Sequence, residues 1–311
     1  MKNSSSTFNF SIRYFTGAVV ACMLLFYFYI WLFAGPKTDP FYNRFTSKRQ
    51  ESLILGSSRA AQGIIPNTIN KNIGSNLFNY SFTLNNSPYG PIYNNSILRK
   101  LSEQERNDSF FILEVNPWSL STNRTNETDN PEKFIENNLF LDKMKFVNSK
   151  PNIEYVLKCY KRPYYSILYN YIIPNSMYLH ADGWLEINID MTEPEVARRK
   201  FAKLSSYLKK LNRSKLSESR IDYLRILISK LKGYGKVSLV RLPVSPELLN
   251  IEEKYAPNFD HLMNEIASDY NVNFINLKSL SPQVMTTDGN HLYKESGEFI
   301  SGILADSLKK L

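Results

Sequence analysis

The chain has 311 residues and a formal net charge of +9, with 38 basic and 29 acidic residues. This length exceeds that of one ordinary domain and is too small for three, so we expect one sizeable globular body and an additional segment. Basic residues alternate with acidic ones in helical patterns, as at 193–220, which disfavours a nucleic-acid-binding protein. A solvated helix face, or attraction to anionic lipid headgroups or an acidic envelope polymer, explains this pattern better.

An uncharged apolar segment runs from Tyr14 to Gly35. As a helix it is roughly 33 Å long, enough to cross the hydrocarbon core of a bilayer. A signal peptide has an apolar region of only about 7 to 15 residues, followed by a small-x-small cleavage site. Pro36 directly follows the segment here. We therefore expect residues 1–35 to form a tail and an uncleaved transmembrane anchor, with a cleaved signal peptide or a buried core helix as the alternatives.

Residues 36–50 are polar, contain two prolines after the span and show no periodicity, so we expect a tether. Beyond it, a body is predicted at 51–311, in which short apolar runs alternate with helical patterns. The expected strands are 52–56, 77–82, 109–116, 236–244 and 272–277, and the expected helices include 92–103, 258–270 and 292–311. A mostly helical insertion is predicted at about 129–234, ending at Gly233 and Gly235.

Strands separated by helices indicate an α/β fold, with a parallel sheet flanked by helices on both faces. Ligands of such sheets bind beyond the carboxyl ends of the strands. The first of these ends carries "LILGSSRAAQG" at 53–63, in which Ser58 follows a strand and a glycine. Ser58 is either a nucleophile held at a strand end or part of an ordinary helix cap.

Histidine is scarce, and only three positions can supply a base for Ser58. His180 lies among turn residues and His261 lies inside a helical pattern, so both are expected to be structural. His291 closes the loop "TTDGNH", three residues after Asp288. An Asp-x-x-His pair lets the carboxylate reach Nδ1 while Nε2 faces outward, as a general base requires. The alternative is that Asp288 caps the following helix or turns the loop.

Three segments in this order, "LILGSSR", "FFILEVNPW" and "DGNH", resemble the SGNH hydrolase superfamily, also called GDSL esterases and acyltransferases. The Gly-Ser-Ser start looks like that of its membrane-anchored envelope branches. The resemblance implies a three-layer, flavodoxin-like fold over about 51–311. It implies Ser58 as nucleophile, His291 as base and Asp288 as the residue that orients the base. Backbone and side-chain donors at Ser58 and Asn116 are implied in the oxyanion hole, and no cofactor or metal is expected.

The sequence departs from the family pattern at several positions. Ser57 replaces the aspartate of Gly-Asp-Ser, and Arg59 replaces an aliphatic residue. Ser81 stands where the second-block glycine would stand, so its N–H is the expected third oxyanion donor. The third block begins with Glu114 instead of glycine, and of its motif only the asparagine is retained.

Two arginines lie next to predicted strand ends, Arg59 and Arg241. They are candidates to bind an anionic group of the substrate. The alternative is that each is a surface or salt-bridged arginine.

The resemblance implies a serine enzyme that hydrolyses or transfers an acyl group. The anchor, the basic composition and analogy with envelope members of the superfamily predict that the enzyme is membrane-tethered and that the group is acetyl on envelope or capsular polysaccharide. An esterase or lipase acting on small or lipid esters at the membrane surface is one alternative. A non-catalytic membrane protein of a polysaccharide assembly system is another. The expected partners are the bilayer, the acylated polysaccharide and a membrane acyltransferase, with no nucleic acid.

An envelope substrate implies a single-pass protein of the bacterial cytoplasmic membrane with an extracytoplasmic body. The charges near the span favour the opposite orientation, because basic residues prefer the cytoplasmic side. Two basic residues precede the span, whereas four follow it: Lys37, Arg44, Lys48 and Arg49.

Overall fold

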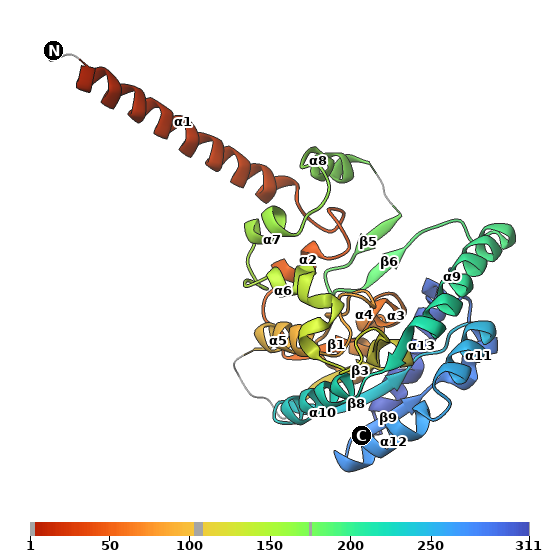
Figure 1. Ribbon diagram of the computed structural model, residues 1–311. Coiled ribbons are helices and arrows are strands. Elements are labelled where there is room, and N and C mark those ends of the chain that lie inside the picture. The colour runs from red at the N-terminus through yellow and green to blue at the C-terminus, as the bar shows by residue number, and fades with distance from the viewer. Residues whose placement is uncertain (1–3, 103–107, 174–175, 311) are drawn as a thin grey trace.

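A parallel five-stranded sheet forms the centre of the computed structural model, which describes residues 4–102, 108–173 and 176–310 (Figure 1). The strand order is β2-β1-β3-β8-β9, and every neighbouring pair is parallel. The strands are β1 (Ser52–Leu55), β2 (Leu77–Asn79), β3 (Ser109–Glu114), β8 (Gly235–Arg241) and β9 (Asn273–Asn276). The predicted α/β class with a parallel sheet is confirmed.

Helices cover both faces of this sheet, which is why its strands are apolar on both sides. Along β1, Leu53 and Leu55 face one apolar cluster while Ile54 faces another. The first cluster packs against α5 (Pro91–Lys100), α10 (Glu218–Lys232) and α12 (Phe259–Asp269). The second packs against α3 (Ser58–Gly63), α4 (Pro66–Ile73) and α13 (Lys294–Leu308). The alternation of side chains along each strand therefore builds the three layers.

The other elements lie mainly in the middle of the chain and around the carboxyl edge of the sheet. The other α-helices are α1 (Ser4–Phe33), α2 (Tyr42–Thr46), α6 (Phe140–Lys143), α7 (Ile153–Lys158), α8 (Tyr165–Ile172), α9 (Glu193–Arg213) and α11 (Pro246–Tyr255). The 3-10 helices are η1 (Pro117–Leu120), η2 (Pro131–Lys133), η3 (Ile135–Asn138) and η4 (Lys278–Gln283).

The middle of the chain contains strands that the helical pattern did not predict. Antiparallel pairs form between β5 (Met177–Leu179) and β6 (Leu185–Ile187), and between β4 (Ser121–Asn123) and β7 (Ser214–Leu216). Each of these strands has only three residues, too few for an alternating pattern to stand out. Helices α9 and α10 match the two amphipathic stretches of this region.

Helix α1 projects from the body at the N-terminal end (Figure 1). Its segment Ile12–Phe33 is long and apolar enough to cross a membrane, and only 6% of its most apolar window is buried. The alternative of a buried core helix is therefore wrong. The carboxyl end of α1 contacts α8, where the rings of Phe33 and Tyr171 meet edge to face.

The segment expected to be a tether packs into the body instead. Phe45 of α2 is fully buried and stacks on Phe82 and Tyr155. Arg44 is also fully buried, and its guanidinium donates hydrogen bonds to the carbonyl oxygens of Asn79, Pro40 and Gly183. Polar composition predicted an extended link, but these carbonyl acceptors satisfy the buried cation.

Candidate active site

Ser57 and Ser58 lie at the carboxyl end of β1 and have different roles in the local structure. Ser57 is the N-cap of α3, and its Oγ accepts a hydrogen bond from the backbone N–H of Arg59 at 3.3 Å. Gly56 makes this turn possible, because its φ of +143° disfavours other residues and a Cβ there would lie 2.7 Å from that of Glu114. The helix-cap interpretation thus applies to Ser57, and the hydroxyl of Ser58 is left to point elsewhere.

The hydroxyl of Ser58 points to His291, which lies 233 residues further along the chain. Ser58 Oγ is 2.8 Å from His291 Nε2, and His291 Nδ1 is 2.9 Å from Asp288 Oδ2. Asp288 Oδ1 also accepts hydrogen bonds from the backbone N–H groups of Asn290 and His291, both at 3.0 Å. The loop therefore holds its own carboxylate against the ring, and the three side chains form the chain of contacts that a serine nucleophile requires.

The charge on Asp288 is stabilised in this position. Burial by itself would raise the pKa of the Asp288 carboxyl. The hydrogen bond from His291 and the charge of Lys203 outweigh burial and hold that pKa well below its ordinary value. Lys203 Nζ lies 3.0 Å from Asp288 Oδ2. Asp288 is thus ionised at neutral pH and can stabilise an imidazolium at His291.

Asn290, which the sequence did not single out, specifies the tautomer of His291 from the opposite side. Its Oδ1 accepts hydrogen bonds from Arg59 Nε at 2.9 Å and Tyr207 Oη at 3.0 Å, so its Nδ2 must be the atom 3.0 Å from His291 Nε2. An amide nitrogen only donates, so Nε2 is the acceptor and the ring proton lies on Nδ1, facing Asp288. This is the tautomer of a general base.

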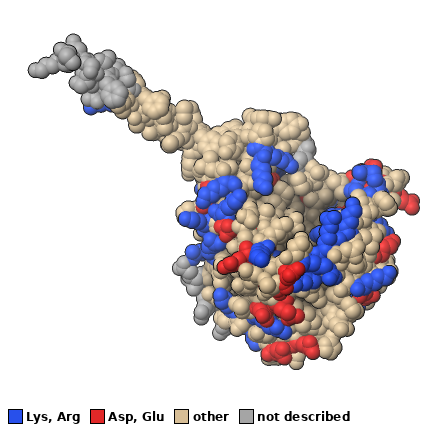
Figure 2. All heavy atoms as spheres, in the orientation of Figure 1, with Lys and Arg blue, Asp and Glu red and all other residues tan. Residues whose placement is uncertain are grey.

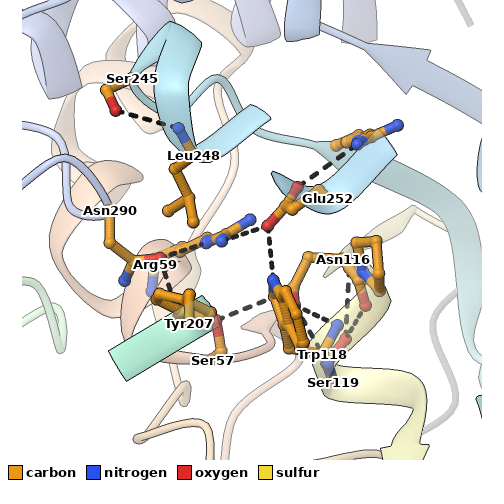
Figure 3. Close-up of polar contacts among 12 residues, drawn as sticks. Ser57, Arg59, Asn116, Trp118, Ser119, Tyr207, Ser245, Leu248, Glu252 and Asn290 are labelled. Atoms are coloured by element: carbon orange, nitrogen blue, oxygen red, sulfur yellow. Dashed lines mark hydrogen bonds and ion pairs between the residues drawn. The ribbon is translucent and has the colours of Figure 1, made fainter. Parts of the chain in front are cut away.

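The two arginines proposed as substrate contacts are buried, and that prediction is wrong. Arg59 Nη2 lies 2.5 Å from Glu252 Oε1, and Arg241 donates to Glu252 Oε2 at 3.3 Å and also to Asp260. Figure 3 shows Arg59 lying between Glu252 and Asn290, with Tyr207 beside it. Arg59 therefore positions Asn290 from within the protein.

Ser81 does not offer the expected oxyanion donor in this structure. It is fully buried, and its N–H donates to Asn79 Oδ1 at 3.2 Å. The N–H of Ser58 is better placed, because the first residue of a helix has no acceptor for its N–H within the helix.

Asn116 lies beside Ser57 at the end of β3. Its Oδ1 caps η1 by accepting from the N–H groups of Trp118 and Ser119, both at 3.0 Å. Its Nδ2 donates to Glu114 Oε1 at 2.7 Å and lies 3.4 Å from Ser57 Oγ. The side chain expected in the oxyanion hole thus lies beside Ser57, the residue before the nucleophile, and its amide is hydrogen-bonded to Glu114.

Glu114, noted in the sequence only as a departure, is a central residue of the site. Its fully buried carboxylate accepts hydrogen bonds from both the N–H and the Oγ of Ser57, each at 2.9 Å. Since β1 and β3 are neighbours, the acid absent at position 57 is supplied from the adjacent strand. The signal in the sequence was that the first block lacks the family's aspartate, at Ser57, while the third block has gained an acid, Glu114.

Each of the other two histidines lies next to a glutamate, which agrees with the expectation that both are structural. His180 Nε2 is 2.8 Å from Glu186 Oε2, and its ring stacks on Trp184. His261 is an exposed residue of α12, next to Glu265.

No protein-family model and no curated protein matches this chain. Among solved structures, an aryl esterase of M. smegmatis is 11% identical, with a TM-score of 0.39, covering 85% of this chain and 100% of its own. Est24, a carbohydrate acetylesterase from Sinorhizobium meliloti, is 10% identical with a TM-score of 0.38, covering 85% and 99%. A putative arylesterase from Agrobacterium tumefaciens is 12% identical with a TM-score of 0.35, covering 83% and 99%. At such low similarity the interpretation of this site rests on its own geometry.

Proposed function

We propose that this protein is a serine esterase or O-acyltransferase that uses Ser58, His291 and Asp288. The observation that carries the proposal is the unbroken series of contacts from Asp288 through His291 to Ser58, at 2.9 and 2.8 Å. Ser58 is partly exposed at the carboxyl edge of the sheet, so a substrate can reach its hydroxyl.

The reaction proceeds through an acyl-enzyme. Ser58 Oγ attacks the ester carbonyl while its proton moves to His291 Nε2, and the carbonyl oxygen becomes an oxyanion. When the tetrahedral intermediate collapses, the C–O bond to the alcohol breaks and His291 returns the proton to the leaving alcohol. In the second half, His291 takes a proton from water or a sugar hydroxyl, that oxygen attacks the acyl carbon, and Ser58 leaves with the proton.

The oxyanion requires donors, and Ser58 N–H is the first of them. Asn116 Nδ2 is the second, once it turns from Glu114 toward the developing charge. Each such donor contributes about 3 to 4 kcal/mol of transition-state stabilisation. The hydrogen bond from Asn116 to Glu114 occupies this donor. It therefore favours a second candidate function, a non-catalytic protein of a polysaccharide assembly system that retains this fold.

Acetyl groups on envelope or capsular polysaccharide are the substrate that we propose, with a membrane acyltransferase as the partner that delivers or receives them. The basic composition and the apolar N-terminal helix support a substrate near the membrane. Small or lipid esters are the alternative substrates, and the length of acyl chain that is cleaved fastest distinguishes them.

Tyrosines of α8 support α1 as a retained membrane anchor. Tyr29 Oη of α1 donates to the carbonyl oxygen of Tyr164 at 2.7 Å and accepts from the N–H of Leu168 at 3.2 Å. Three tyrosines of α8 beside this junction are exposed: Tyr165, Tyr169 and Tyr171. Tyrosine is enriched where proteins meet the membrane–water interface. Cleavage of α1 as a signal peptide would remove the partner of this surface.

The test of activity is hydrolysis of p-nitrophenyl acetate by the full chain in detergent micelles. Ser58→Ala should abolish burst and turnover, whereas the neighbouring Ser57→Ala should retain turnover, since Ser57 Oγ has no contact with His291. Equal rates for Ser58→Ala and wild type would exclude the nucleophile assignment.

Orientation is tested separately from activity, by cysteine labelling from outside intact cells. A cysteine introduced on the exposed face of α12 should be labelled before lysis. Labelling that requires lysis would place the body in the cytoplasm and exclude an envelope substrate.

A further inference from the structure

A cavity of about 500 Å³ lies near the site but contains none of its catalytic residues. Loops at the carboxyl edge of the sheet line one side, with Leu84 and Asn85 after β2 and Trp118 after β3. The carboxyl end of α9 lines the other side through Lys210 and Arg213. Ligands of parallel sheets bind at this edge, so the cavity is in position to hold part of a substrate.

The charges in this cavity are all positive. Its lining includes Lys133, Lys210, Arg213 and Arg220 and no aspartate or glutamate. Glu136 neutralises Arg220 through two hydrogen bonds of 2.7 and 2.9 Å. Within the described parts of the chain, the other three cations form no ion pair. The lining of the cavity therefore carries three positive charges that no ion pair neutralises.

Lys210 shows this lack of compensation most clearly. Its Nζ lies over the ring of Tyr207, at 5.3 Å from the centroid. Burial lowers the pKa of the Lys210 ammonium, and the nearby charges of Lys203 and Arg59 lower it further. An anion bound beside it would reverse this repulsion. Figure 2 shows that Lys and Arg side chains also form a stripe over α9.

The rest of the lining suits a saccharide. Seven neutral polar residues of the lining have side chains that can donate to and accept from hydroxyl groups: Asn85, Ser121, Thr122, Asn123, Thr125, Asn126 and Ser214. An apolar ligand has few groups that could form hydrogen bonds with these side chains, whereas a sugar ring has a hydroxyl on most of its carbons.

A short series of contacts joins the cavity to the base. Lys210 contacts Tyr207, Tyr207 Oη donates to Asn290 Oδ1 at 3.0 Å, and Asn290 Nδ2 lies 3.0 Å from His291 Nε2. These contacts run through the buried side chains of Tyr207 and Asn290, so they join the cavity to the catalytic base within the protein. The proposal below requires that a glycan bound in the cavity reaches Ser58 along the surface.

We propose that this cavity is a subsite for an acidic saccharide, in which Lys133, Lys210 and Arg213 bind a carboxylate or phosphate group of the glycan. The inference rests on the proposed function, and it narrows the substrate to the esters of negatively charged polysaccharides. The cations that recognise the substrate are these three, not Arg59 and Arg241.

The test compares O-acetylated oligogalacturonate with O-acetylated xylo-oligosaccharide of equal length, with the full chain in detergent micelles. The wild type should prefer the acidic ester. Lys133→Gln/Arg213→Gln should reduce that preference about 100-fold through KM, at about tenfold for each charged hydrogen bond. Lys133→Gln alone, a change at an exposed position, should reduce the preference for the acidic ester about tenfold. An acetylated sugar phosphate in a third arm distinguishes phosphate from carboxylate.

Arg198→Gln is the matched control, because Arg198 is an exposed cation of the same helix that pairs with Glu195 outside the cavity. It should keep the wild-type preference. If the wild type has equal KM values for the acidic and neutral esters, the subsite proposal is wrong. Turnover of p-nitrophenyl acetate in the same preparation would leave the esterase proposal intact. If no ester is turned over, calorimetric binding of oligogalacturonate to wild type but not to the double variant would still support the subsite, and no binding would overturn it.

Discussion

Replacement of Asp288 by asparagine tests the mechanism most directly, because the change keeps the shape of the side chain. The backbone N–H groups of Asn290 and His291 both donate to Oδ1, so the amide oxygen of the new residue must occupy that position. Its NH₂ group then takes the place of Oδ2 and faces His291 Nδ1. The ring would have to accept there and carry its proton on Nε2, where it blocks proton transfer from Ser58.

On the opposite side of the ring, Asn290 disfavours a proton on His291 Nε2. Asn290 Nδ2 donates toward His291 Nε2 and is held in that orientation by Arg59 and Tyr207. With Asp288→Asn, either tautomer of the ring leaves one donor facing another donor. We expect kcat to fall by roughly 10⁴, a loss of about 5.5 kcal/mol in transition-state stabilisation, as for a triad whose histidine is held in the wrong tautomer.

The assay is turnover of p-nitrophenyl acetate at pH 7, with urea unfolding measured in parallel. Glu154→Gln is a matched control, because Glu154 also accepts from two backbone N–H groups, of Lys145 and Phe146, and pairs with a lysine, Lys158. It should lose similar contacts without a change in kcat. If folded Asp288→Asn protein keeps its kcat within tenfold of wild type, the proposed orientation of His291 is wrong.

Three further predictions concern stability and the membrane. Arg59→Ala should lower the free energy of unfolding by about 3 to 5 kcal/mol in urea, because it leaves Glu252 buried with a weaker partner; a loss below 1 kcal/mol would contradict the structural role. Because the pKa of Asp288 is lowered, its stabilisation should be complete above about pH 4 and decline as the pH falls further. The difference in urea unfolding between wild type and Asp288→Asn should therefore be smaller at about pH 2.5 than at about pH 5, and a difference that does not shrink over that range would refute this. In liposomes that contain a lipid with a fluorescence quencher near the headgroup, Tyr165→Trp should add tryptophan fluorescence that is quenched relative to wild type, and unquenched added fluorescence would remove α8 from the interface.

The sheet was predictable because each central strand is an apolar run bounded by polar residues. In β1 and β3 the run is buried on both faces, which is the pattern of parallel strands. The three-residue strands β5 and β7 were not predictable, since their pairing depends on partners that are brought together only by the fold. Helix α2 was missed for the same reason, because Arg44 looks like a surface residue until its carbonyl acceptors are known.

The residues of the triad were predictable from chemistry and order along the chain. A serine after a strand and glycine needs a base, and of the three histidines only His291 closes a loop with an aspartate three residues before it. The oxyanion donors were harder to predict, because a backbone N–H is free to bind an oxyanion only if no protein acceptor lies next to it. Ser81 satisfied the spacing, yet the side chain of Asn79 occupies its N–H.

The sequence by itself therefore determined the parallel α/β body, the apolar N-terminal helix and the identity of Ser58, Asp288 and His291 as candidates, because these follow from local patterns and from residue chemistry. Only the tertiary structure decided where the charges act. It placed Arg59 against Glu252 inside the protein and Glu114 beneath Ser57, and it left Lys210 in a cavity with no ion pair to any residue that the structure describes. The physical reason is that pairing and burial of a charge depend on neighbours that are distant in sequence, which composition and periodicity do not encode.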